Sequence, residues 1–215
     1  VGKVGVTIYN YGQMNTLLDQ IPLEQMNPSM TINATAAWLL GLYIANAEEQ
    51  GIASDTLRGT TQNDIVKEYL SRGTYIFPPE ASKRLIVDMI AYCSQHVPLW
   101  NPINICSYHL QEAGATPVQE IAYSFANAID VLDAVRDSGQ VSGEDFPRVV
   151  GSISFFVNSG IRFVEEVCKM RAFTQMWDEI CESRYGVADP KLRPVSYTHL
   201  RAHETDSSLV CRLLL

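Results

Sequence analysis

Short β-branched runs alternate with longer amphipathic stretches along most of the chain. The short runs predict strands at 4–8, 29–33, 59–62, 103–106 and 153–157. The longer stretches predict helices at 14–20, 36–50, 63–70, 78–96, 116–132 and 164–180. Strict alternation of strands with helices predicts a parallel sheet with helices packed outside it.

A doubly wound sheet and a (β/α)8 barrel both fit this alternation. Polar residues gather where the predicted strands end, at Thr31 and Asn33, 60–63, 107–109 and Ser154. In barrels the active site is built at that end, from several strands. No glycine-rich nucleotide-binding sequence follows a strand, which favours the barrel. The predicted fold class is therefore α/β, and about five β/α units predict a partial TIM barrel, since a full one takes about 250 residues.

Charge and cysteine content narrow the class of protein. The 215 residues carry 16 Lys+Arg against 24 Asp+Glu, a formal net charge of −8, which argues against a nucleic-acid or anionic membrane partner. No apolar run is long enough to span a membrane. The five cysteines form an odd set without a Cys-x-x-Cys pair, which favours reduced thiols. We expect a cytoplasmic protein without a nucleic-acid or membrane partner.

The segment 194–215 breaks the pattern of the preceding chain and resembles a translated sequencing adapter. We therefore expect residues 1–193 to form the folded domain and 194–215 to be a non-native tail. Within the tail, His199 and His203 share the spacing of a zinc-protease helix, but Leu200 occupies the position of the required glutamate. We expect no metal site there.

Two segments at predicted strand ends carry candidate chemistry. In the first, Thr60 and Gln62 are two residues apart and point the same way from a strand. Arg72 follows about one helix later and offers a planar fork suited to carboxylate or phosphate. The alternative is a surface ion pair between Arg72 and Glu68, four residues earlier on a helix.

The second segment places Tyr108 and His109 directly after a predicted strand. The pair would bring an aromatic edge and a titratable donor to the mouth of a barrel. The alternative is a pair that only packs and hydrogen-bonds to the backbone. No Ser/His/Asp or Cys/His set has spacing that indicates nucleophilic catalysis.

Four motifs resemble the adenosylcobalamin-dependent acyl-CoA mutases, the methylmalonyl-CoA mutase family: GTTQND at 59–64, RGTYIFPPE at 72–80, SYHLQEAGAT at 107–116 and SFF at 154–156. The resemblance covers residues 1–193, and NPSMTINATAAWLL at 27–40 looks closest to the ethylmalonyl-CoA mutase branch. It implies a barrel that holds an acyl-CoA along its axis and meets adenosylcobalamin at its mouth. A radical then abstracts hydrogen and the thioester group migrates. The cobalt-ligating histidine belongs to a separate cobalamin domain that these residues do not include.

The resemblance also implies roles for single residues. Tyr108 matches the tyrosine beside the adenosyl group, His109 the donor to the thioester carbonyl, and Arg72 the clamp on the free carboxylate. The other matches are to substrate-binding positions, Thr60, Gln62 and Ser154, and to cofactor-binding positions, Val4, Ser71, Arg72 and Glu112.

Arg72 favours a dicarboxylic substrate, and Gly73 stands where methylmalonyl enzymes commonly carry Asn. We therefore expect conversion of ethylmalonyl-CoA to methylsuccinyl-CoA, with methylmalonyl-CoA as the alternative. Ser152 departs from the family arginine that contacts the CoA phosphates, and Arg148 or Arg162 could substitute for it.

Two further classes stay open. One is a non-catalytic barrel subunit of a heterodimeric mutase, against which Arg72, Tyr108 and His109 argue. The other is a cobalamin-independent barrel lyase, which would need a metal-ligand cluster or a Schiff-base lysine. We expect the full enzyme to be a homodimer or heterodimer, and residues 1–215 alone to be inactive, because an open parallel barrel has unpaired edges.

Overall fold

The structure is a computed structural model that describes residues 5–193, 196–197 and 201–202. Its strands are short and are paired in parallel. They are β1 (Ser29–Met30), β2 (Gly59–Thr61), β3 (Trp100–Asn101), β4 (Asn104–Cys106), β5 (Ser154–Phe156), β6 (Asn158–Ser159), β7 (Ser196–Tyr197) and β8 (Arg201–Ala202). The fold is therefore α/β with parallel sheets.

The strands lie side by side in the order of the sequence. One sheet runs β1-β2-β3, a second β4-β5-β7 and a third β6-β8. Pro102 separates β3 from β4, and the Asn104 amide donates to the Gln62 carbonyl at 2.9 Å, so β4 continues alongside the β2 segment. Proline cannot donate to a ladder, which explains the break.

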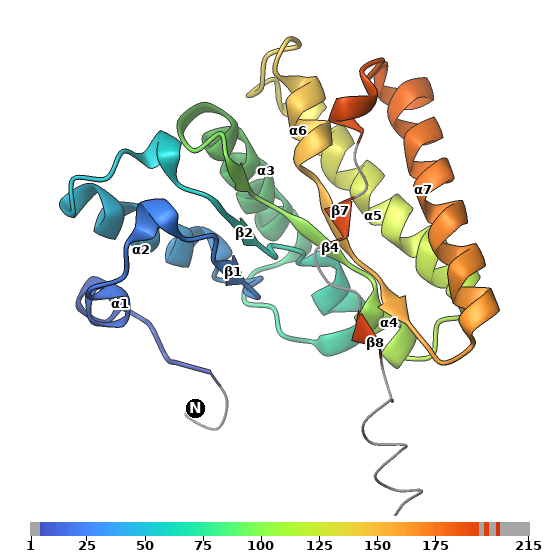
Figure 1. Cartoon of the computed structure of the whole chain (residues 1–215), viewed down its shortest axis with the longest axis horizontal. Coiled ribbons are helices and arrows are strands. Elements are labelled where there is room, and N and C mark those ends of the chain that lie inside the picture. Colours follow the sequence, from blue (N-terminus) through green and yellow to red (C-terminus); the bar gives the residue numbers. More distant parts are fainter. Residues whose placement is uncertain (1–4, 194–195, 198–200, 203–215) are drawn as a thin grey trace, which may run out of the picture.

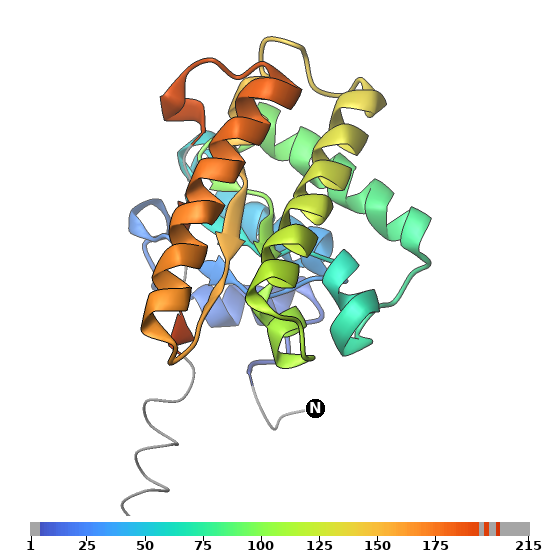
Figure 2. The same cartoon turned by 90° about the vertical axis from the view of Figure 1, so that its right-hand side faces the viewer.

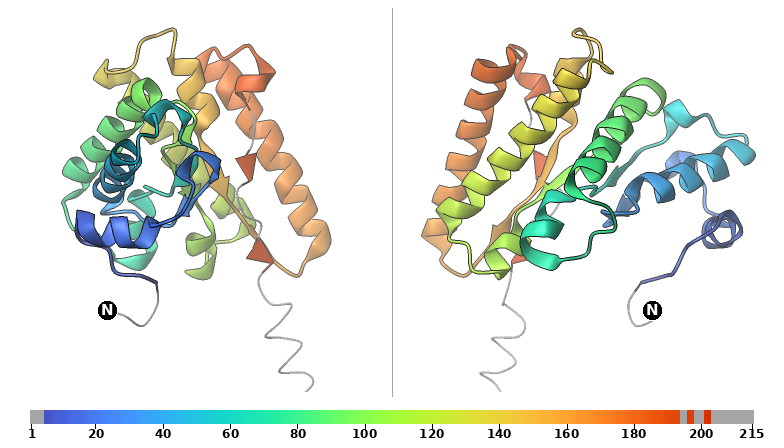
Figure 3. Two further views of the ribbon diagram at one scale, coloured as in Figure 1. Left: turned by 60° about the vertical axis from the view of Figure 1, so that its left-hand side comes forward. Right: turned by 180° about the vertical axis from the view of Figure 1, so that it is seen from behind.

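The helices cover the strands from outside. They are α1 (Tyr11–Leu18), α2 (Ala36–Glu49), α3 (Pro79–His96), α4 (Tyr108–Glu112), α5 (Pro117–Ser138), α6 (Phe146–Ser152) and α7 (Phe163–Tyr185). Short 3-10 turns lie at Leu23–Gln25, Ser54–Thr56 and Pro190–Leu192, and a π-helical turn, η3, at Glu68–Arg72. Figure 1 shows the strands crossing the molecule, and Figures 2 and 3 show α3, α5 and α7 as a row over one side of them.

Two apolar clusters hold these layers together. The larger joins α5 and α7 to the strands through Phe125, Phe155, Phe173 and Trp177, all buried. Their rings meet at centroid distances of 4.5 to 6.1 Å, the range in which aromatic pairs attract. The smaller cluster packs α2 against Trp100 and the start of the sheet. None of the described helices is long and apolar enough to cross a membrane.

Several predicted elements are confirmed. The helix at 36–50 is α2, with Gly51 in the left-handed conformation (φ +77°) just beyond it. The helix at 78–96 is α3, with Pro79 in its first turn. The helix from 116 is α5, which Thr116 caps in a reciprocal capping box with Gln119.

Other predictions were wrong. The described part of the 4–8 strand, residues 5–8, forms no strand: Gly5 takes a positive φ of 72° and Val6 is 72% exposed. The helix at 63–70 starts only at Val66 and becomes the π-turn η3, because Asn63 has a left-handed φ of 47°. The segment 194–215 is described only at β7 and β8, which pair with β5 and β6, and its non-native origin stays a prediction.

Candidate functional site

Arg72 and His109 meet at the centre of the candidate site. Arg72 is the last residue of η3, and Gly73 ends that turn with a left-handed φ of 69°, its amide donating to the Glu68 carbonyl. His109 lies in α4, directly after β4, and is 5% exposed. The Arg72 Nη1 atom is 3.2 Å from His109 Nε2. A turn after β2 and a turn after β4 thus deliver the two side chains to one point.

Glu68 lies behind the Arg72 guanidinium. Its Oε1 is 3.9 Å from Arg72 Nη1, and its side chain is fully buried whereas that of Arg72 is 46% exposed. Asn33 Nδ2 donates to Glu68 Oε1 at 2.8 Å, and Thr74 Oγ1 donates to Oε2. The i, i+4 pair therefore exists, but it is anchored in the interior rather than lying on a helix surface.

Thr60 and Gln62 line a cavity of about 200 Å³, and Asn33 links Gln62 to Glu68. Gln62 Oε1 accepts from Asn33 Nδ2 at 2.9 Å and from Lys67 Nζ. Its amide NH₂ is consequently the group left to donate to a ligand. The other residues of the cavity wall come from neighbouring strands: Ser29, Met30, Thr31, Asn104 and Phe156.

A fully buried carboxylate ties the strand ends together. Asp64 accepts from the Cys106 amide at 2.8 Å and from Asn127 Nδ2 at 2.8 Å, which links the end of β2 to β4 and α5. Burial raises the pKa of Asp64, and the nearby Lys67 charge opposes that rise. Asp64 and Lys67 were not predicted as site residues, and Glu68 was expected only as a surface partner of Arg72, although three charged residues within five positions after a buried strand were a usable signal.

Tyr108 packs against His109 with ring centroids 3.7 Å apart, and against Phe156 at 4.5 Å. These contacts fix the plane of the imidazole. Ser154, in contrast, is fully buried, and its hydroxyl accepts from Asn104 Nδ2 at 2.8 Å. Its proposed contact with a substrate stays a prediction, with Asn104 standing between it and the cavity.

The whole described site lies within a family match. The methylmalonyl-CoA mutase family model matches residues 1–208. The chain belongs to the methylmalonyl-CoA mutase family. It is 64% identical over 92% of its length to an ethylmalonyl-CoA mutase of Cereibacter sphaeroides and 62% identical over 92% to one of Methylorubrum extorquens. It is 44% identical over 89% to a methylmalonyl-CoA mutase of Escherichia coli. The chain spans about 30% of the length of the ethylmalonyl-CoA mutases.

Of the cofactor positions that the resemblance implies, Glu112 lines a second cavity. Ser71 Oγ donates to the Lys67 carbonyl at 2.8 Å, Glu112 is exposed at the end of α4, and Val4 lies outside the described residues. A cavity of about 460 Å³ beside α4 is lined by Gln111, Glu112, Pro117, Asn158, Gly160, Ile161, Arg162, Glu165 and Glu166. Within the described part of the chain, Gln111 Oε1 is buried without a hydrogen-bond partner. Such an acceptor fits a ligand that carries amide or hydroxyl donors, as cobalamin does.

No cluster of three or more His, Cys, Asp and Glu residues in the described ranges could hold a metal ion. Beside the second cavity, however, three charges are buried together. Lys169 Nζ lies 2.9 Å from Glu120 Oε2 and 2.6 Å from Glu166 Oε2, and it donates to the Asn158 carbonyl at 2.6 Å. This buried triad, Glu120–Lys169–Glu166, fixes the wall that Glu166 and Asn158 form.

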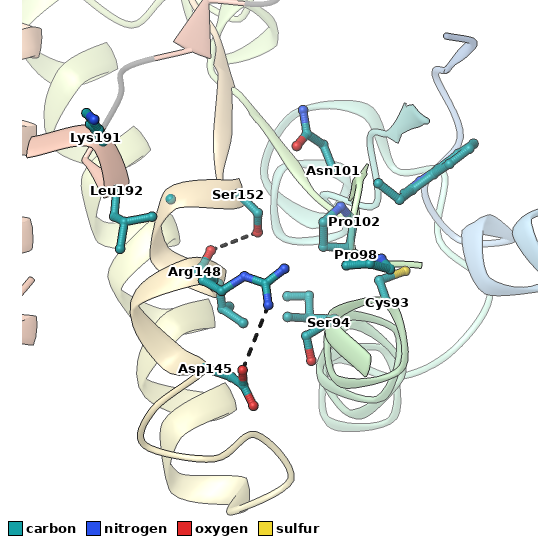
Figure 4. Close-up of a pocket in the computed structure, with 14 residues that line it drawn as sticks. Cys93, Ser94, Pro98, Asn101, Pro102, Asp145, Arg148, Ser152, Lys191 and Leu192 are labelled. Atoms are coloured by element: carbon teal, nitrogen blue, oxygen red, sulfur yellow. Dashed lines mark hydrogen bonds and ion pairs between the residues drawn. The ribbon is translucent and has the colours of Figure 1, made fainter. Parts of the chain in front are cut away.

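A third cavity lies before the start of β5, at the opposite end of the strands. It has a volume of about 240 Å³, and Figure 4 shows Arg148, Ser152 and Lys191 on its wall. Arg148 is 4.0 Å from Asp145 and lies one helical turn before Ser152. Arg162 lies beyond β6 and pairs with Glu165 at 3.0 Å. Of the two arginines that could replace the missing family arginine, Arg148 is the one that shares a cavity with Ser152.

Proposed function

We propose that this chain supplies the substrate-binding part of an isomerase that rearranges the carbon skeleton of a dicarboxylic acyl-CoA. The contact between Arg72 and His109, 3.2 Å apart, carries the proposal. A guanidinium binds a carboxylate through two parallel hydrogen bonds, and an imidazole can donate to a carbonyl oxygen. Two such groups side by side suit a substrate whose carboxylate and thioester flank the same carbon atoms.

The favoured substrate is ethylmalonyl-CoA, which would give methylsuccinyl-CoA. Identities of 62% and 64% to two ethylmalonyl-CoA mutases, against 44% to a methylmalonyl-CoA mutase, support this choice over methylmalonyl-CoA. Gly73 gives only weak support for ethylmalonyl-CoA over methylmalonyl-CoA. Its left-handed φ of 69° favours glycine or asparagine through the backbone alone.

Adenosylcobalamin is the cofactor that the family implies, and its cobalt ligand would come from residues outside this chain. When bound, it would supply the radical that removes a hydrogen atom from the substrate. Ser71, Glu112 and the cavity beside α4 would hold it. Tyr108, seated on His109, would shield the reacting carbons from water, and His109 would donate to the thioester oxygen where negative charge develops.

A partial TIM barrel is the proposed architecture. Its support is the sequential order of the parallel strands, together with α3, α5 and α7 all lying over one side of them. A doubly wound sheet would reverse its strand order and carry helices on both faces. We further propose a cytoplasmic homodimer or heterodimer whose remaining barrel strands come from residues outside this chain.

A non-catalytic barrel subunit is the second candidate. Against it stands the convergence of side chains from two separate turns: Arg72 contacts His109, which packs against Tyr108, although 36 or more positions separate the arginine from the pair. A subunit without catalysis would have no need to keep this geometry.

Replacement of Arg72 by alanine tests the proposal. Loss of a charge-assisted, bidentate contact costs about 1.5–3 kcal/mol, so kcat/KM for ethylmalonyl-CoA should fall by about 10- to 150-fold. The assay is the rate of methylsuccinyl-CoA formation by the full-length protein encoded by this gene, with added adenosylcobalamin. Arg84→Ala is the matched control, since Arg84 is an exposed arginine on α3. Full activity in Arg72→Ala, or no isomerisation by the parent protein, would refute the assignment.

A further inference from the structure

Arg72 constrains the protonation of His109. A guanidinium carries only N–H donors, so at 3.2 Å the His109 Nε2 atom must accept the hydrogen bond from Arg72 Nη1. An imidazole that accepts at Nε2 is neutral and carries its proton on Nδ1. In this arrangement, Nε2 cannot donate to a substrate oxygen.

Arg72 is the more exposed member of the pair. Its side chain is 46% exposed, whereas His109 is 5% exposed and packed under Tyr108. Glu68, behind the guanidinium, is held by Asn33 and by Thr74. A ligand that draws the guanidinium away would therefore displace Arg72 while Glu68 and His109 stay in place.

Several charged groups of the described residues lie around His109, and Arg72 is in direct contact with it. On η3 these groups are Arg72 and Glu68, and α4 carries Glu112 at its exposed end. On α5, Glu120 is committed to Lys169 at 2.9 Å and to Ser107 Oγ at 2.9 Å. A change at Arg72 is thus one that acts directly on His109.

We propose that a substrate carboxylate, by engaging Arg72, releases His109 Nε2 and switches the ring to the Nε2–H tautomer. Nε2, once released, takes up a proton from water in the site, and the buried Nδ1 atom gives up its proton to water when the ring turns toward the site. The ring therefore ends neutral and no net charge is created. Recognition of the carboxylate then prepares the donor for the thioester oxygen. This inference rests on the proposed function and makes Arg72 a determinant of turnover as well as of binding.

The coupling gives selectivity that affinity alone would not. A neutral acyl-CoA of similar size leaves Arg72 on His109, so the thioester donor stays blocked even when the ligand is bound. Discrimination against such a substrate would appear in kcat more than in KM. A simple clamp would lower the affinity and leave the donor unchanged.

The test reads the tautomer directly. The full-length protein is labelled with ¹⁵N-histidine, and the His109 resonances are assigned with His109→Gln. Without ligand, Nε2 should resonate as an unprotonated ring nitrogen. Saturating malonate should shift it to the range of a protonated nitrogen, and malonamide, the neutral analogue, should leave it unchanged. Arg84→Met, which removes an exposed arginine outside the site, should respond like the parent protein.

Arg72→Met supplies the second arm: malonate should no longer change the His109 tautomer, in a protein whose circular dichroism matches the parent. Calorimetry of malonate binding tests the carboxylate clamp separately from the tautomer switch. Binding without a change at Nε2 would overturn the switch and leave the carboxylate clamp standing. No binding at all would overturn both. A protonated Nε2 in the ligand-free protein would also refute the switch.

Discussion

Lys169→Met should lower the free energy of unfolding far more than the loss of an ordinary surface ion pair does. The Lys169 side chain is 1% exposed, and its Nζ lies within 2.9 Å of oxygens of Glu120, Glu166 and Asn158. The substitution keeps the aliphatic volume but leaves two carboxylates in the interior without their cation. Removing one partner of a buried pair costs about 3–5 kcal/mol, because the remaining charge stays uncompensated.

The matched control is an ion pair of the same length on the surface. Lys83 Nζ and Asp130 Oδ1 are also 2.6 Å apart, but their side chains are 35% and 50% exposed. Lys83→Met should cost at most about 1 kcal/mol, since water and salt screen exposed pairs. Burial, rather than distance, is therefore the variable that separates the two substitutions.

Urea unfolding of the full-length protein measures both effects. The unfolded fraction is read by pulse proteolysis, in which the peptides released from α5 and α7 are quantified. With an m-value of about 2 kcal/mol/M, Lys169→Met should lower the midpoint by about 2 M. Adding Glu120→Gln should recover part of the loss, because glutamine can still accept from Ser107 and from the Asn158 amide. A midpoint shift equal to that of Lys83→Met would refute the uncompensated-charge reasoning.

Two further predictions concern the core. Gly59→Ala should destabilise the protein by about 1–3 kcal/mol in the same assay, because a Cβ there would overlap the buried Trp100 ring, and Gly143→Ala, where the space is open, is its control. Among the described cysteines, iodoacetamide at pH 8 should modify the exposed Cys168 in the folded protein, as read by mass spectrometry. The buried thiols, whose pKa desolvation raises to about 12, should stay unmodified until urea unfolds the chain: Cys93, Cys106 and Cys181. Prompt labelling of these three would contradict their burial.

The elements that sequence could predict are those with local causes. Pro79 opens α3 and the Thr116–Gln119 capping box opens α5, so each helix start depends on residues a few positions apart. The strands were shorter than predicted, and β3 was missed. Pro102 divides the segment 100–106 into two short strands, β3 and β4. Their pairing with β2 and β5 shows that both are strands, and the sequence of this segment alone does not reveal it.

The candidate site was harder to predict, because its supporting charges resemble surface residues in sequence. Lys67 and Glu68 belong to residue types that are almost never fully buried unless paired, yet they are 1% and 0% exposed. Their partners, Gln62 and Asn33, lie at the ends of two other strand segments. Spacing along the chain therefore predicted the Arg72–Glu68 pair and could not predict that Glu68 is buried and held by Asn33.

This division between exposed and buried groups explains how the site can be both specific and responsive. The groups that would meet a substrate, Arg72 and His109, rest on a polar base of Asn33 and Glu68, with Asp64 locking the strand ends beneath. Buried polar networks of this kind are costly to leave unsatisfied, so they resist rearrangement. The half-exposed guanidinium is the member that a ligand can move at small cost. A carboxylate thus acts on one side chain within a rigid frame, which is the condition for its binding to be transmitted to His109.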